Sequence, residues 1–277
     1  MTRTRRTHTR WWSVPGTLTA AALATVAITT PAGAGTTAAA ADEQPAAPIS
    51  SRIVGGEYAS TAEYPWVVYL TDAAGNQFCG GTIAAANKVI TAAHCVTGGA
   101  PPEITVVSGR DDKGSDDGTE TPVRDVWVHP DFQNASSGAD VAVLTLDGDL
   151  GETPLPIATA GDLPEYRPGG PTTVLGWGTT TEGGAPSSTL RQAHPPITTD
   201  QDCSQAYGGQ YDPRGQVCAG LPQGGEDSCQ GDSGGPLVAG DKLIGIVSWG
   251  NGCARPGQPG VYTRLGAYHN EVQAQLR

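Results

Sequence analysis

Short runs of β-branched and aromatic residues, each bounded by Gly, Pro, Asn or Asp, recur along most of this chain of 277 residues. The runs lie at 66–70, 88–90, 104–107, 123–128, 141–146, 172–175 and 243–249. Many short strands with frequent turns are typical of sandwiches or barrels, whereas parallel sheets need long helical crossovers between their strands. The pattern therefore predicts an all-β fold with few helices.

The C-terminal end has a different period. Leu265, Tyr268, Val272 and Leu276 follow one another at spacings of three, four and four residues, which places them on one face of a helix. We expect a C-terminal helix that packs on the core through this face.

The first 34 residues have the layout of a secretory signal peptide. Four arginines precede an apolar run at 17–30, and Ala32-Gly33-Ala34 supplies small residues for cleavage. A membrane anchor is the alternative, but the run is shorter than the roughly 18 to 20 residues needed to cross a bilayer. We expect residues 1–34 to be removed as a signal peptide, whose end could lie as far along as about residue 41. The mature chain is then expected to be secreted and extracellular, with no attachment to a membrane.

Residues 35–52 are rich in Ala, Thr and Pro and show no periodic apolar face, so they are either a linker or a propeptide. All six cysteines follow this stretch, and no pair has the spacing of a zinc or redox site. An even count in an exported chain indicates three disulfides, although 15 pairings are open. The net charge of −12 disfavours a nucleic-acid partner, because such proteins usually carry a basic face.

Three motifs carry residues suited to nucleophilic catalysis. Ser233 lies in Gly231-Asp232-Ser233-Gly234-Gly235, where the glycines leave backbone N–H groups clear to face a carbonyl oxygen. A serine nucleophile needs a base, which His94 in Thr91-Ala92-Ala93-His94-Cys95 can supply. The base needs an orienting acid, and Asp140 stands at the start of an apolar strand.

These motifs, together with Ile53-Val54-Gly55-Gly56, Gly176-Trp177-Gly178 and Ser248-Trp249-Gly250, stand in the order seen in the chymotrypsin-like serine proteases. The chain resembles this family over 53–277, and most of all the secreted bacterial trypsins. The resemblance implies a trypsin-like peptidase domain of two six-stranded antiparallel β-barrels, joined near 155–172, with the site in the cleft between them. It also implies an enzyme that works as a monomer without a cofactor.

Catalytic roles follow from the resemblance. Ser233 corresponds to the nucleophile, His94 to the general base and Asp140 to the acid that orients the histidine. The N–H groups of Gly231 and Ser233 correspond to the oxyanion hole. Because the histidine must be neutral to act as a base, activity is expected to rise from acid toward neutral pH. The other histidines of the mature chain are interpreted as structural: His129, His194 and His269.

The resemblance also identifies a primary specificity pocket. Asp227 corresponds to its floor, where a buried carboxylate selects Arg or Lys and rejects apolar side chains. Gly250 and Gly260 match the wall glycines that keep the pocket open, and Ser228 a hydroxyl that helps to bind the cation. Ser248 to Gly250 are expected to pair with the extended substrate as an added strand. The predicted activity is therefore hydrolysis of peptide bonds after Arg or Lys.

In this family the chain is cut just before the Ile-Val-Gly-Gly start. The resemblance therefore implies that residues 35–52 are a propeptide and that cleavage between Arg52 and Ile53 frees an ammonium that pairs with Asp232. Since the cut follows an arginine, the enzyme could activate itself. The resemblance pairs Cys79 with Cys95, Cys203 with Cys218, and Cys229 with Cys253.

No metal site is predicted. Many animal trypsins bind calcium in the loop that corresponds to the one after Gly109, but here this loop begins with Arg110 and is shorter, and its acids fit a solvated hairpin equally well. Protein or peptide substrates are the expected partners, with proteinaceous inhibitors as a further candidate class. The alternatives are a catalytically silent homologue, an unrelated disulfide-rich binding module, and a protease that cuts a single partner after Arg.

Overall fold

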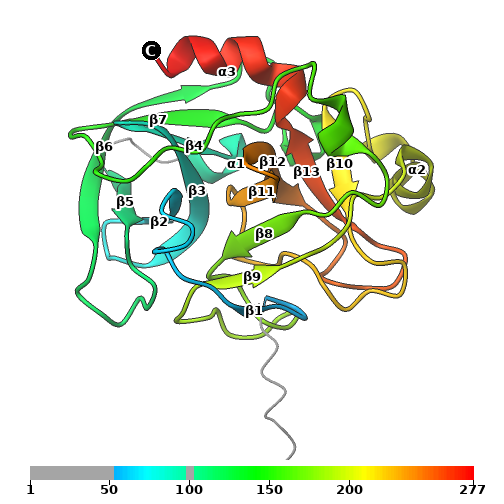
Figure 1. The fold of residues 1–277 in the computed structure, drawn as a ribbon, viewed down its shortest axis with the longest axis horizontal. Helices are drawn as coiled ribbons and strands as arrows, with labels where there is room; N and C mark the ends of the chain where they lie inside the picture. The colour runs from blue at the N-terminus through cyan, green and yellow to red at the C-terminus, as the bar shows by residue number, and fades with distance from the viewer. Residues whose placement is uncertain (1–52, 98–102) are drawn as a thin grey trace, which may run out of the picture. The chain divides into compact units, whose positions relative to one another are not determined.

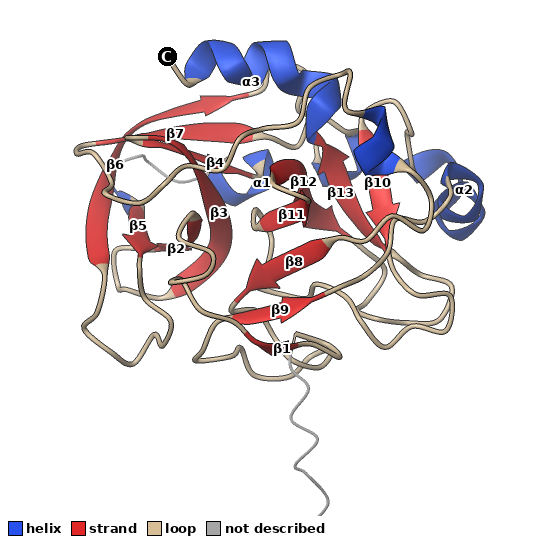
Figure 2. Ribbon diagram, viewed as in Figure 1, coloured by secondary structure: helices blue, strands red, loops and turns tan. Residues whose placement is uncertain are grey.

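The computed structural model describes residues 53–97 and 103–277, and six of its strands close into an antiparallel barrel (Figures 1 and 2). The barrel order is β2-β3-β4-β7-β6-β5. The strands are β2 (Val67–Thr71), β3 (Gln77–Ala85), β4 (Lys88–Thr91), β5 (Thr105–Ser108), β6 (Thr119–Val128) and β7 (Ala142–Leu146). Their inward side chains form a core of Val, Ile and Leu, with Leu70, Ile83, Ile90 and Leu144 wholly buried.

A second antiparallel sheet has the strand order β1-β9-β8-β11-β12-β13-β10. Its strands are β1 (Glu57–Tyr58), β8 (Thr173–Gly176), β9 (Arg191–Ala193), β10 (Gln216–Ala219), β11 (Pro236–Ala239), β12 (Lys242–Trp249) and β13 (Gly260–Arg264). It differs from the expected second six-stranded barrel in two ways. The strand β1 adds a seventh strand at one edge. The sheet is not closed by a ladder between its two edges, because the chain after β9 pairs with β10 only at the isolated bridge Ile197↔Ala219.

Helices are few, as the sequence predicts, and they cover the ends of the sheets (Figure 2). The α-helices are α1 (Ala93–Val96), α2 (Asp200–Tyr207) and α3 (His269–Gln275). Short 3-10 turns occupy Ala135–Ser137, Leu163–Tyr166, Gly208–Gln210 and Leu265–Tyr268. The C-terminal helix packs through its predicted face, because Leu265 and Val272 are fully buried and Tyr268 and Leu276 contact the same core.

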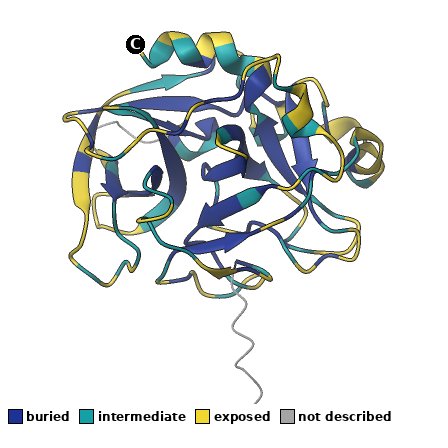
Figure 3. Ribbon diagram, viewed as in Figure 1, coloured by how far each residue is buried: buried dark blue, intermediate teal, exposed yellow. Residues whose placement is uncertain are grey.

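The barrel and the second sheet meet along β3, β11 and the segment that links the two halves. Gly80 on β3 donates its N–H to the carbonyl of Ser233 at 2.7 Å, just before β11. The linking segment pairs with β12 through the parallel bridge Ile157↔Leu243. Figure 3 shows that the strands at this junction are buried and that the exposed residues gather in the outer loops. The candidate catalytic residues come from both sides of this junction.

The predicted signal peptide, residues 1–34, and the predicted propeptide, residues 35–52, lie outside the described residues. In the described part of the chain, no helix is long and apolar enough to cross a membrane.

Candidate active site

His94 and Asp140 form a closely bonded pair at the end of the barrel. His94 lies on α1 directly after β4, and Asp140 lies just before β7, the strand that pairs with β4. The His94 Nδ1 and Asp140 Oδ2 atoms are 2.7 Å apart, and the backbone N–H of His94 donates to Oδ1 at 2.9 Å. Since a carboxylate only accepts hydrogen bonds, Nδ1 carries the proton and Nε2 is left as the basic nitrogen.

The Asp140 carboxylate is fully buried and is held by further donors. The Ser248 hydroxyl donates to Oδ2 at 2.5 Å, and Thr263 Oγ1 donates to the backbone carbonyl at 2.9 Å. Ala139 turns the chain into the site at φ +53°, and its N–H donates to the Tyr268 hydroxyl oxygen at 2.7 Å. These contacts fix the carboxylate, and with it the ring of His94. The sequence assigned only a substrate-pairing role to Ser248.

Ser233 lies in a tight turn that requires its glycines. Gly231 has φ +93° and Gly234 has φ +80°, which side chains rarely tolerate. A Cβ on Gly234 would lie 2.2 Å from Thr91 Oγ1, so the loop packs directly against β4. Among the described residues, the N–H groups of Gly231 and Ser233 donate to no backbone or side-chain acceptor. Two adjacent free donors can bind a developing oxyanion.

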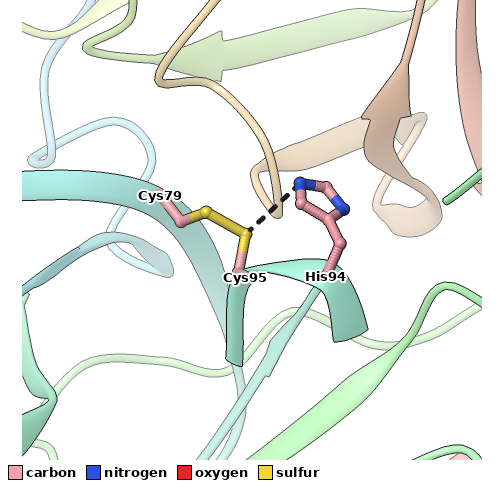
Figure 4. Close-up of side chains that lie close together, drawn as sticks. All are labelled: Cys79, His94 and Cys95. Carbon is pink, nitrogen blue, oxygen red and sulfur yellow. Dashed lines mark hydrogen bonds between the residues drawn. A yellow bond between two sulfur atoms is a disulfide. The ribbon is translucent and has the colours of Figure 1, made fainter. Parts of the chain in front are cut away.

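The hydroxyl of Ser233 and the ring of His94 are not hydrogen-bonded to each other in the described part of the chain. Instead, His94 Nε2 faces Cys95 Sγ at 3.7 Å, beside the Cys79–Cys95 disulfide (Figure 4). Hydrogen bonds of this kind are often open in free enzymes and close when substrate binds. Cys79, His94 and Cys95 are also the sole group of potential metal ligands within 53–97 and 103–277, but disulfide sulfurs do not act as thiolate ligands.

A pocket of about 140 Å³ opens beside Ser233. Its lining contains every residue that the sequence assigned to the specificity pocket: Asp227, Ser228, Ser248, Gly250 and Gly260. Asp227 is only 3% exposed and receives N–H bonds from Ala254 at 3.0 Å and Ser228 at 2.8 Å. A Cβ on Gly260 would lie 2.5 Å from Asp227 Oδ1, so a side chain there would displace the carboxylate.

The Asp227 carboxylate has no cationic partner within 4 Å among the described residues, as judged from their ion pairs. Burial raises its pKa to about 7, although the two N–H donors oppose the rise. A buried carboxylate without a counter-ion is costly, and a ligand cation that enters the pocket removes this cost.

Asp232, next to Ser233, is a second buried carboxylate. It is fully buried and accepts N–H bonds from Gly178 at 2.7 Å and Cys229 at 2.9 Å. Burial raises its pKa to about 6, and the charge of Lys113 acts in the opposite direction. A Cβ on Gly176 would lie 2.2 Å from its Oδ1, which explains the glycine of the Gly176-Trp177-Gly178 motif.

Ile53 is wholly buried in the core of the second sheet, and Val54 next to it pairs with Asp227, in the segment between β10 and β11 that carries both aspartates. The carbonyl of Val54 accepts the N–H of Asp227 at 3.2 Å. The first described residues therefore pack directly against the wall of the pocket. Arg52 lies outside the described residues.

The three disulfides have the pairing that the resemblance implied: Cys79–Cys95, Cys203–Cys218 and Cys229–Cys253. The first adjoins His94, and both cysteines of the third line the pocket. The remaining histidines make contacts outside the His94–Asp140 pair. The ring of His129 meets Tyr268 edge to face and accepts the N–H of Asp131. The backbone N–H of His194 donates to the Glu226 carboxylate, and His269 Nδ1 lies 3.0 Å from the carbonyl of Ala158.

The acidic loop after Gly109 is organised around an arginine. Arg110 Nη1 pairs with Glu120 at 2.9 Å, and Nε donates to the carbonyl of Asp117 at 2.5 Å. Asp111 turns away to accept from Thr61 N and Thr61 Oγ1, each at 2.6 Å. A guanidinium therefore occupies the interior of this loop.

The chain was compared with known proteins. The sequence model of the Trypsin family matches residues 53–272. A trypsin from Saccharopolyspora erythraea is 53% identical over 224 residues, which cover 81% of this chain and 98% of that protein. A vitellin-degrading protease from Bombyx mori is 43% identical and covers 85% of this chain and 90% of its own length. Trypsin eta from Drosophila melanogaster is 38% identical, with 81% and 88% covered.

The match spans the closed barrel and the second sheet and ends within the C-terminal helix α3. A protease acts on protein or peptide substrates, and the buried acid–histidine pair beside a serine and a pocket is suited to that chemistry. The chain therefore belongs to the trypsin family and is a trypsin-like serine endopeptidase.

Proposed function

We propose that this protein is a secreted endopeptidase that hydrolyses peptide bonds after Arg or Lys and is made as a precursor activated by cleavage between Arg52 and Ile53. The observation that carries the specificity is the Asp227 carboxylate, which is 3% exposed, lies in the pocket beside Ser233 and has no cationic side chain paired with it in 53–97 or 103–277. A substrate guanidinium or ammonium would supply the missing charge. An apolar side chain would leave the carboxylate buried and unpaired, which costs several kcal/mol.

The peptide bond is cleaved in two steps. The substrate enters with its basic side chain in the pocket, which brings its carbonyl carbon to Ser233 Oγ. His94 Nε2 takes the proton of the hydroxyl as Oγ adds to the carbon, and the N–H groups of Gly231 and Ser233 bind the oxygen that becomes negative. His94 then gives the proton to the leaving amine. Water repeats the sequence on the acyl-enzyme and releases the new carboxylate.

Asp140 supports His94 throughout this cycle. Its bond to Nδ1 keeps the proton on that nitrogen, so Nε2 always faces the reaction as the base. When Nε2 is protonated, the buried carboxylate stabilises the imidazolium charge at 2.7 Å. The hydroxyl of Ser248 keeps the carboxylate in this position.

Activation is proposed to act through Asp232. In the uncut chain the nitrogen of Ile53 is an amide and carries no charge. Cleavage after Arg52 would convert it into an ammonium, which the buried Asp232 carboxylate favours because its two N–H donors and the charge of Lys113 offset only part of the cost of its burial. Because Asp232 stands between Gly231 and Ser233, the new ion pair would order the oxyanion hole. The Arg at the cut agrees with the proposed specificity and allows self-activation.

A substrate panel tests the specificity. Protein whose N-terminus is confirmed as Ile53 is given short amides that differ only before the cut, with Arg, Lys, Phe or Ala. We expect turnover of the Arg and Lys amides alone, abolished by a serine-directed covalent inhibitor. Turnover of the Phe amide would retain the mechanism and refute the role of Asp227. A strong preference for one extended sequence after Arg would instead identify a protease with a single partner.

Separate measurements test export and activation. Material from the culture medium should begin at Ile53 or within 35–52, whereas retention of residues 1–34 would contradict secretion through a cleaved signal peptide. The Arg52→Gln precursor should remain weakly active. If a Ser233→Ala precursor is processed at Arg52 as fast as the wild type in a purified system, the enzyme does not activate itself.

A further inference from the structure

Lys113, in the loop between β5 and β6, contacts two residues that are themselves linked to the Gly231–Asp232 segment before Ser233. Its Nζ donates to Gln77 Oε1 at 2.6 Å and lies 3.5 Å from the carbonyl of Trp177. Gln77 in turn donates from Nε2 to the carbonyl of Gly231 at 3.2 Å. The ammonium is thus one side chain away from a proposed oxyanion-hole residue.

The contact with Trp177 leads to the same loop by a second route. The carbonyl of Trp177 and the N–H of Gly178 belong to one peptide group, and this N–H donates to Asp232 Oδ1 at 2.7 Å. One peptide plane therefore accepts from Lys113 on one side and donates to Asp232 on the other. Hydrogen bonds in such chains polarise one another, and those that involve charged groups are the stronger ones.

Electrostatics connects Lys113 with Asp232 as well. The ammonium is half-buried, and burial lowers its pKa while the charges of Asp232 and Asp112 raise it. In the described part of the chain, Asp232 has no ion pair within 4 Å. Lys113 is the basic group whose charge favours the ionised form of Asp232.

The backbone of Lys113 is fixed, so the ammonium is presented from a stable base. Its N–H donates to the carbonyl of Ser188 at 2.8 Å, and Asp112 forms a bridge with Thr189. The carbonyl of Asp111 accepts the indole N–H of Trp177 at 2.9 Å. The segment 111–113 therefore holds Trp177 by its ring and by its carbonyl.

Gly231 needs external support of this kind. It has φ +93° and no side chain, so its own conformational preferences do not fix the plane of its peptides. The bond from Gln77 fixes its carbonyl, and Asp232 is fixed by its own N–H donors. The N–H of Gly231 belongs to the preceding peptide, which is held at the Gln230 carbonyl by the N–H of Thr179 at 2.7 Å. A loss of the contact from Gln77 would loosen the adjoining Gly231–Asp232 peptide and let the Gly231 N–H tilt away from the substrate.

We propose that Lys113 is a positioning residue for the oxyanion hole. It holds the Gly231–Asp232 segment in its productive orientation by two routes, one through Gln77 and the other through the Trp177–Gly178 peptide. This inference rests on the proposed role of the Gly231 N–H as an oxyanion donor. Lys113 touches no substrate atom in this scheme, and its charge strengthens both hydrogen-bonded routes.

The test compares mature wild type with Lys113→Met, which keeps the aliphatic stem and removes the ammonium. Two inhibitors distinguish an effect on the specificity pocket from an effect on the oxyanion hole. Benzamidine fills the pocket and makes no oxyanion. A peptide ending in arginine aldehyde accepts Ser233 Oγ at its carbonyl carbon while the serine proton passes to His94, and its former carbonyl oxygen then occupies the hole.

We expect kcat for the Arg amide to fall about tenfold in Lys113→Met, and affinity for the aldehyde to fall by a similar factor. KM and benzamidine affinity should change less than about twofold, because the pocket is untouched. Lys113→Arg should recover most of the loss. Gln77→Leu removes one of the two routes and should show a selective loss of the same kind. The double variant should lose less than the product of the two single fold-losses, since the two residues share that route.

The matched control is Lys88→Met. Lys88 is also a half-buried lysine whose Nζ donates to a neutral oxygen, Thr145 Oγ1 at 2.9 Å, but it lies on the barrel strand β4. It should leave all four quantities unchanged. If Lys113→Met does not fold, Gln77→Leu decides the question through the ratio of aldehyde to benzamidine affinity.

Equal losses of aldehyde and benzamidine affinity would show a general structural effect and overturn the proposal, as would wild-type values in both variants. A wild type that hydrolyses no Arg amide and binds no aldehyde would instead refute the proposed function itself. The two failures are therefore distinguishable in one data set.

Discussion

Replacement of Asp227 by Asn should make the folded protein more stable at alkaline pH while it removes the preference for basic substrates. Asparagine has nearly the shape of a protonated aspartic acid and keeps an oxygen for the N–H of Ser228, which donates to Asp227 Oδ1 at 2.8 Å. Its NH2 group cannot accept the N–H of Ala254, which donates to Asp227 Oδ2 at 3.0 Å, and this loss adds a cost that does not depend on pH. The pH dependence of the difference between the two proteins isolates the free energy of ionising Asp227 in the pocket.

The magnitude follows from the pKa. Burial raises the pKa of Asp227 from 3.8 to about 7. Because the folded pKa is higher than the unfolded one, the contribution of this group to stability is fully present below about pH 4 and is lost as pH rises through 7. One pKa unit is equivalent to about 1.4 kcal/mol, so the loss reaches about 4 kcal/mol at pH 8.

Urea unfolding between pH 4 and 8 measures this effect, with Ser233→Ala in both proteins to prevent self-digestion. The free energy of unfolding of the Asn variant, relative to that of the parent, should rise by about 4 kcal/mol between pH 4 and pH 8. Asp116→Asn, at an exposed aspartate, is the control and should give a difference that does not depend on pH. In the active background, kcat/KM for the Arg amide should fall about 10²- to 10³-fold.

A constant difference across the pH range would refute this reasoning, because it would mean that the carboxylate is not destabilised by burial. A less stable Asn variant at pH 8 would show that the pocket already supplies a counter-charge to Asp227.

The pocket, the acid–histidine pair and the acidic loop each give a further measurable expectation. Because only ionised Asp227 pairs with a cation, benzamidine affinity should be constant above pH 7 and fall about tenfold per pH unit below it; an inhibition titration that is flat from pH 5 to 8 would contradict this. Ser248→Ala removes a donor to buried Asp140 and should lower kcat/KM for the Arg amide about tenfold, whereas an unchanged value would show the hydroxyl to be dispensable. Since Arg110 pairs with Glu120 inside the acidic loop, a calcium chelator should leave the thermal unfolding midpoint unchanged, and a clear drop would reveal a bound cation.

The short β-branched runs of the sequence predicted β2, β4, β5, β6, β7, β8 and β12, but not β1, β3, β9, β10, β11 and β13. Among the missed strands, β3 (Gln77–Ala85) is the longest. It contains Gly80 and Gly81, which suggest a turn when local preference alone is considered. The structure shows a packing reason for both. A Cβ on Gly80 would lie 3.1 Å from Gly235, and one on Gly81 would lie 2.7 Å from Val89 Cγ1. Close approach between distant segments required the glycines, and such contacts are not visible in a single sequence.

Helix α2 was missed for a related reason. Asp200–Tyr207 has few apolar residues and no clear apolar face, so its period is weak. Its stability comes from the Thr199 side chain, which accepts Asp202 N at 2.9 Å, and from the Cys203–Cys218 disulfide. The Thr three residues before Asp was the signal that could have identified the helix start.

Sequence order was sufficient to propose the candidate catalytic and pocket residues, because each stands in a motif with its own local pattern. Lys113 and Gln77 stand in no motif, and their contact spans 36 residues. Thr263 likewise reaches the Asp140 carbonyl from β13, across 123 residues. Residues that support a site from neighbouring segments depend on the tertiary fold, so only the structure could identify them.

The two buried carboxylates of this site share one physical principle. Asp227 and Asp232 are both almost completely buried, and burial raises the pKa of each. Each therefore favours any state in which a cation arrives beside it. In our proposal the cation for Asp227 is the substrate side chain, which gives specificity, and the cation for Asp232 is the ammonium of Ile53, which gives activation. The segment 227–233 carries both carboxylates and the nucleophile Ser233. The burial of two acids in this one segment therefore connects substrate specificity and activation with the geometry of the catalytic serine.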